Sequence, residues 1–226
     1  MDILILAVIV YIVILFLGYY ILKSVIKALF FAGTIFVIIS LVLGVLMFID
    51  IKDIQENFQT SSKLMIIESN SEVASAFISA NNKAEIVNSS KFPQLSSYLK
   101  KKDYESLLDG NYKVIIYSLS AVKEMDNFSI EIAGTAFYRD ELVNIMQNEG
   151  KAKYWSEKLY IPDYHQLRAA VFAELISKKL TGPENIITFV TGLKTGKIKV
   201  YPETIYFKMM KLLPTSFVEA RLKSLS

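Results

Sequence analysis

The chain has 226 residues, of which 53% are hydrophobic and 12% aromatic, and its formal net charge is +3. It contains no cysteine, which excludes disulfide bonds, thiolate metal sites and cysteine nucleophiles. Basic residues gather towards the C-terminus, in residues 194–226, without any recognised nucleic-acid-binding module. Nucleic-acid binding is therefore not expected.

Two apolar runs without charge, residues 3–22 and 28–49, occupy the N-terminus. About 20 apolar residues of helix span a hydrocarbon core of about 30 Å, so each run is long enough to cross a membrane. One continuous helix through both would be about 70 Å long and would bury Lys23 and Lys27 in hydrocarbon, at about 2.5 to 3.5 kcal/mol each. We therefore expect an integral membrane protein with a transmembrane helical hairpin in residues 1–50.

Small residues recur along both runs and indicate close helix packing in the membrane. The predicted packing positions are Ala7, Gly18, Gly33, Ser40 and Gly44. They favour hairpin closure or self-association, although Gly and Ala are common in membrane helices for no specific reason.

Orientation is encoded by a few lysines. Lys23 and Lys27 favour a cytoplasmic loop with both termini outside, whereas Lys52 and Lys63 favour the reverse. Two glycosylation acceptor patterns, at Asn88 and Asn127, suit an external domain. The interpretation adopted is that residues 63–226 lie outside the cytoplasm.

After the membrane, apolar residues at helical spacing predict an amphipathic stalk over residues 51–62. A single α+β domain is expected over residues 63–226, with strands first and helices later. Predicted strands are 63–68, 72–79, 112–119, 128–133 and a closing pair, 197–201 with 204–209; predicted helices are 139–147, 164–180, 184–193 and one from Thr215; residues 80–97 are predicted to be a loop.

The single histidine, His165, is the one candidate for catalysis. Asp163 could orient its ring and Glu174 follows on the same predicted helix, which permits proton transfer or metal binding. A structural or surface histidine is the alternative, because the usual metal motifs need further ligands. No catalytic, metal or cofactor site is therefore assigned, and no cofactor is expected.

The basic C-terminal segment, residues 194–226, mixes cations with aromatic and apolar residues. This composition suits a segment lying on an anionic lipid surface. The residues proposed to contact the membrane surface are Lys208, Lys211, Arg221 and Lys223. The alternative is that the apolar residues belong to the domain core and the lysines to its wet face.

The predicted hairpin, residues 53–58 leading to 63–65, residues 111–114 and residues 201–208 resemble an uncharacterised archaeal family of two-transmembrane-helix membrane proteins. The resemblance implies an archaeal membrane location and a shared architecture, and it assigns no activity.

Three functions follow from these patterns. The first is a membrane-anchored, non-enzymatic binding or scaffolding module whose partners are the lipid bilayer and a second copy or another membrane protein. The alternative is a membrane-bound enzyme or enzyme subunit that uses the cluster around His165. The third is a pore or transporter accessory element. Neither apolar run contains an ionisable residue to mark a transport pathway, which argues against this function.

Overall fold

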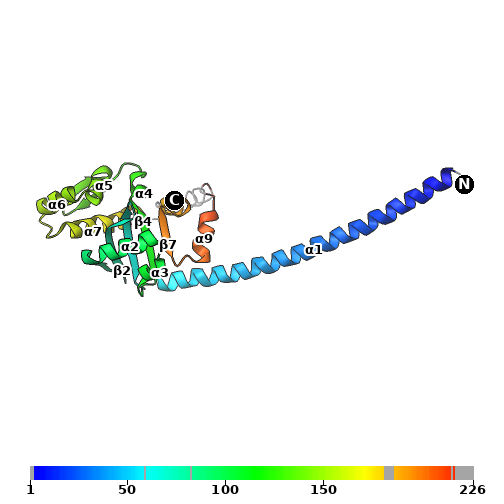
Figure 1. The fold of residues 1–226 in the computed structure, drawn as a ribbon, viewed down its shortest axis with the longest axis horizontal. Coiled ribbons are helices and arrows are strands. Elements are labelled where there is room, and N and C mark those ends of the chain that lie inside the picture. Colours follow the sequence, from blue (N-terminus) through cyan, green and yellow to red (C-terminus); the bar gives the residue numbers. More distant parts are fainter. Residues whose placement is uncertain (1–2, 59, 82, 181–185, 215, 217–226) are drawn as a thin grey trace. The chain divides into compact units, whose positions relative to one another are not determined.

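A computed structural model describes residues 3–58, 60–81, 83–180, 186–214 and 216. The chain divides into two compact units, Met1–Ile49 and Asp50–Ser226. The first unit is helical, and the second is an α+β domain with a mixed sheet (Figure 1).

The first unit belongs to one continuous helix, α1, which runs from Ile3 to Asn57. The predicted hairpin is therefore wrong, since Lys23 and Lys27 lie inside the helix. The connecting residues, Lys-Ser-Val-Ile-Lys, contain no Gly, Pro or Asn to start a turn. The expected cost of burying Lys23 and Lys27 also assumed that both apolar runs lie in hydrocarbon at the same time. By length and composition, α1 is the one helix of the described residues able to cross a membrane.

The second unit is built on a five-stranded sheet with the order β3-β2-β1-β4-β7. Its strands are β1 Lys63–Ser69, β2 Glu72–Ala80, β3 Lys83–Ile86, β4 Lys113–Ser118 and β7 Ile198–Tyr201. β1 and β4 are parallel, whereas the other neighbours are antiparallel. The predicted hairpin of β1 and β2 is confirmed, with Asn70 and Ser71 at positive φ in its turn. A separate two-stranded sheet pairs β5, Ser129–Ile132, with β6, Thr135–Tyr138.

Helices cover both faces of the five-stranded sheet (Figure 1). α2, Phe92–Lys101, and α3, Tyr104–Leu108, pack on one face, preceded by the short 3-10 helix η1, Ser89–Lys91. The other elements are α4 Leu119–Lys123, α5 Arg139–Gln147, α6 Glu149–Lys158, α7 Tyr164–Leu175 with a π-helical turn η2 Ile176–Leu180, α8 Ile186–Thr195 and α9 Ile205–Leu212.

Alternation along the strands builds a separate core on each face, because successive side chains point to opposite sides. Leu64 and Ile66 of β1 face α2 and α3. Met65 and Ile67 face the larger core, which holds α7 and the second sheet. The central strands β1 and β4 are thus buried on both sides, and their first residues lie where α1 ends.

Two predicted segments differ from the structure, and one was not described. Residues 80–97 form β3, η1 and the start of α2 rather than a loop. Residues 204–209 begin α9 instead of a closing strand, because Phe207 is buried while Tyr206 and Met210, at helical spacing, pack on the same core. The helix predicted from Thr215 lies outside the described residues.

Candidate functional site

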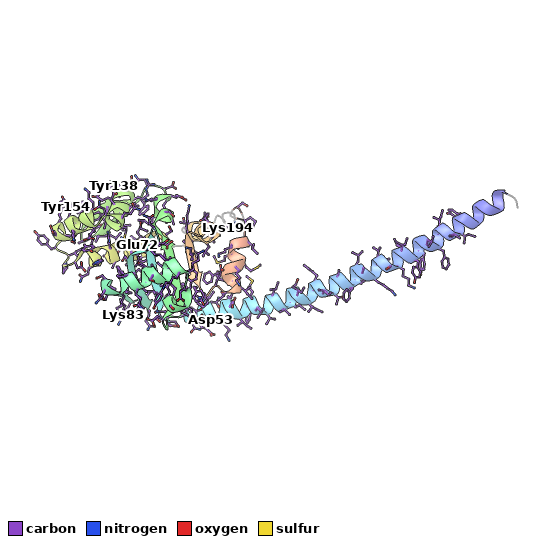
Figure 2. All side chains as sticks on the ribbon, viewed as in Figure 1. Asp53, Glu72, Lys83, Tyr138, Tyr154 and Lys194 are labelled. Atoms are coloured by element: carbon purple, nitrogen blue, oxygen red, sulfur yellow. The ribbon has the colours of Figure 1, made fainter. Side chains whose placement is uncertain are left out.

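The end of α1 is fixed into the α+β domain by a cluster of polar side chains, here called the helix root. It consists of Asp50, Asp53, Tyr112, Lys113 and Tyr206. The last turns of α1 supply the acids, β4 and the residue before it supply Tyr112 and Lys113, and α9 supplies Tyr206. Figure 2 shows Asp53 at this end of the domain, with Tyr138 and Tyr154 at the opposite end.

Asp53 is the centre of the hydrogen bonding. Its carboxylate accepts from the Tyr112 hydroxyl over 2.5 Å and from the Asn57 side-chain amide over 2.8 Å. These bonds, Tyr112's first, lower the pKa of Asp53 below its ordinary value. Burial and the neighbouring carboxylate raise the pKa of Tyr112, so the pair is an ionised acid bound by a neutral phenol.

Asp50 holds α9 in place. Its carboxylate accepts a hydrogen bond of 3.2 Å from the backbone N–H of Tyr206, in the first turn of α9. An acid suits this position because the first N–H groups of a helix have no partner within the helix. Asp50 therefore joins the end of α1 to the start of α9.

Lys113 is buried at 2% exposure at the first position of β4. Its ammonium donates to the Pro202 carbonyl over 3.2 Å and lies 4.7 Å from the centre of the Tyr112 ring and 5.8 Å from that of Phe207. Burial lowers its pKa, while Asp53 and Asp50 oppose that shift. The two aspartates therefore favour the charged form of Lys113 and partly offset the effect of burial on its pKa.

A second buried lysine, Lys63, stands beside Lys113, because the two residues are partners in the parallel β1–β4 register. Its ammonium donates to the carbonyls of Phe58 and Ser61, just after the end of α1. A cation here balances the negative end of the helix dipole. Ile54 and Phe58 pack against the larger core and exclude water from one side. The helix root and the adjacent Lys63 thus form a charged, partly buried connection with two lysines and two aspartates.

No protein-family model matches this chain, and neither the curated proteins nor the solved structures searched for comparison contain a match. Inferences about function therefore depend on the residues themselves.

The structure does not bring the predicted histidine cluster together. Asp163 caps α7 by accepting from the backbone N–H of His165 over 3.1 Å, so it does not orient the imidazole. Glu174 lies nine residues further along α7, about 13 Å along the axis, and pairs with Lys178 at 3.2 Å. The His165 ring packs on Phe92 and Tyr164.

The predicted packing residues of the first unit all lie on one helix. Ala7, Gly18, Gly33, Ser40 and Gly44 follow one another along α1, so they do not close a hairpin. Nothing lies within 4 Å of a Cβ built on Gly18, Gly33 or Gly44. These positions leave the described part of α1 open to a close approach from another helix.

Of the four cations predicted to contact lipid, two are described. Lys208 is exposed on α9, and Lys211 is half-buried in an ion pair with Glu203. Arg221 and Lys223 lie outside the described residues.

Sequence reasoning missed the helix root. One signal was available, since Lys113 begins the most continuous apolar strand of the domain, where a lysine is unexpected. The spacing of Asp50 and Asp53, the first acids after the apolar runs, was a second. Their partners lie 156 and 59 residues away, and no local pattern points to them.

Proposed function

We propose that the protein is a membrane-anchored, non-enzymatic binding module whose helix root holds the α+β domain in a fixed attachment to its anchor. The single observation that supports this function best is the Asp53–Tyr112 hydrogen bond within the root. A protein that only keeps a domain near the membrane can use a flexible linker. Here the last turns of α1 are packed into the domain instead. A scaffold that positions a partner needs such a fixed connection.

The partner face that we propose lies at the opposite end of the domain from the root (Figure 2). Three tyrosines project from β6 and from the region of α6, namely Tyr138, Tyr154 and Tyr160, the last 95% exposed. The Trp155 ring contacts Tyr154 and lies 4.6 Å from the Lys158 ammonium. Aromatic side chains with a neighbouring cation are typical of protein interfaces, so the proposed occupant is another membrane protein.

A photo-crosslinking residue at Tyr160 in the full-length protein, kept in its native membranes, tests this function. We expect one discrete protein adduct, which Tyr154→Ala abolishes because the mutation removes an adjacent aromatic contact. The same probe at Lys83, on the edge strand β3, is the control and should give no such adduct. An adduct at Lys83 as strong as at Tyr160, or none at Tyr160, would contradict the proposal.

The membrane location and orientation form part of the proposal. The run 28–49 is the proposed span, with Lys23 and Lys27 on its cytoplasmic side and the domain outside. The acceptor residues Asn88 and Asn127 are both exposed, which is compatible with an external domain. Because the chain has no cysteine, a cysteine at Ser90 gives a clean test. An impermeant thiol reagent should label it in intact cells; labelling only after lysis would reverse the orientation.

The first apolar run, residues 3–22, lies outside the proposed span, so its apolar side chains need another surface to pack against. α1 has 55 residues, about 80 Å of helix, whereas a hydrocarbon core is about 30 Å thick. We propose that copies of the same chain pack along this run, because identical apolar helices of equal length cover each other from end to end. Disulfide crosslinking of a cysteine at Gly18 in membranes should yield dimers, and a cysteine at Lys83 should not. Monomer alone at both positions would exclude self-association.

A further inference from the structure

We infer that α9 is a second membrane attachment, which lies on an anionic lipid surface beside the point where α1 leaves the bilayer. The inference rests on the proposed span over residues 28–49. It goes beyond that span because it assigns a lipid-contacting surface to the α+β domain itself.

The position of α9 follows from Asp50. This residue is the first charge after the apolar run that ends at Ile49, so it marks the boundary of hydrocarbon in the proposed span. The Asp50 carboxylate accepts from the backbone N–H of Tyr206 over 3.2 Å. The first turn of α9 must therefore lie at the same depth, next to the lipid headgroups.

The two sides of α9 differ in the way that an interfacial helix requires. Phe207 is buried at 4% exposure, and Tyr206 and Met210 pack on the larger core. On the outer side, Met209 is 40% exposed and Leu212 is 74% exposed. With Ile205 and Lys208 they form one stripe at the spacing i, i+3, i+4 and i+7. A stripe of three apolar residues and one lysine that faces away from the core, on a helix at headgroup depth, fits burial in the bilayer interface.

Charge selects the kind of lipid. Lys208 lies within the outer stripe and forms no ion pair with any described residue. Lys194 reaches the end of α9, where its ammonium donates to the Leu213 carbonyl over 2.5 Å. The nearby acids are engaged, since Glu203 pairs with Lys211 and Asp50 binds Tyr206. The outer surface is thus cationic and apolar, which matches anionic headgroups above acyl chains.

Lipid-borne quenching of a fluorophore on single cysteines tests the inference. The full-length protein is reconstituted into vesicles of phosphatidylcholine alone or with phosphatidylserine, with brominated acyl chains as the quencher. A probe at Leu212 should be quenched strongly in the anionic vesicles and much less in the neutral ones. Lys208→Glu should weaken its quenching by about fivefold or more, as expected for loss of a lysine at an anionic surface.

Two further probes separate the possible failures. A probe at Val37, within the proposed span, reports the anchor, and one at Ile86 on β3 is the unquenched control. Quenching at Val37 without quenching at Leu212 overturns the inference and leaves the anchor intact. No quenching at Val37 contradicts the proposed span. Equal quenching at Leu212 in both lipids overturns the anionic preference. If the Leu212 probe is quenched neither by the brominated lipid nor by a water-soluble quencher, another chain covers α9 and the inference is overturned.

Discussion

The hydroxyl of Tyr112 donates a 2.5 Å hydrogen bond to the carboxylate of Asp53, a residue 59 positions earlier in the chain. The bond joins the start of the central parallel strands to the last turns of a helix that is mainly apolar before Asp50. The attachment of α1 to the domain is therefore part of the folded structure, and the contribution of each residue to its stability can be measured by mutation.

Removing the Tyr112 hydroxyl should loosen this attachment. Hydrogen bonds to charged groups contribute about 1.5 to 3 kcal/mol, so Tyr112→Phe should lower the free energy of unfolding of the domain by that amount. Urea titration of the full-length protein in detergent, followed by Trp155 fluorescence, provides the measurement. Tyr160→Phe is the matched control because Tyr160 is exposed. Equal effects of the two changes would show that the bond contributes nothing.

Replacing Lys113 by a neutral residue should cost less stability than replacing it by a negatively charged one. Lys113→Met keeps the length of the side chain and removes the hydrogen bond to the Pro202 carbonyl, so stability should change by about 1 kcal/mol. Lys113→Glu adds a carboxylate near Asp50 and Asp53 and should cost about 3 to 5 kcal/mol. Thermal unfolding of both variants gives the comparison, and a methionine variant as unstable as the glutamate variant would refute this account.

Acid should weaken the helix root through Asp53. The pKa of this carboxyl is lowered in the folded state, so the stability that it contributes is complete above the unfolded value of about 3.9 and is lost as pH falls through the folded value. Asp53→Asn should therefore reduce the drop in melting temperature between pH 5 and pH 3. Glu157→Gln, at an exposed position, serves as control. An unchanged pH profile in Asp53→Asn would rule out this linkage.

Gly192 permits the close contact of α8 with β7. A Cβ at this position would lie 2.5 Å from Cδ1 and 2.6 Å from Cγ1 of the buried Ile198. Gly192→Ala should therefore destabilise the domain by about 1 to 3 kcal/mol, the usual effect of overpacking. Adding Ile198→Val removes the nearest atom and should restore part of the loss, as measured by urea unfolding. Additive losses in the double variant would argue against the steric cause.

Sequence patterns predicted elements whose signals are local. The turn residues Asn70 and Ser71 between two strand-like segments identified β1 and β2, and the sequence 139–147 identified α5 with its observed bounds. The segment 80–97 was misread because its Asn and Ser residues outweighed Phe92, Leu95 and Leu99, which repeat at helical spacing and build one side of α2. Local propensity gave way there to burial against the sheet.

The site was harder to predict than the fold, for a physical reason. Polar contacts in the helix root join Asp50 to Tyr206 and Asp53 to Tyr112, and neither pair shares an element or a motif. Only the sheet order, which places β7 next to β4, brings the start of α9 to the start of the central strands. The continuity of α1 was also missed. Because both apolar runs are long enough to span a membrane, Lys23 and Lys27 were assumed to lie in hydrocarbon if the helix continued.

The two outer strands of the five-stranded sheet limit how this domain can assemble. β3 is exposed along its whole length and carries Lys83 and Glu85, while β7 carries Lys199 and ends before Pro202, which has no N–H to donate. Charges and a proline at such edges oppose pairing with a strand of another chain. With the proposed membrane anchor, many copies could be concentrated in one membrane without their sheets joining, and the proposed association would then use side-chain surfaces and helices.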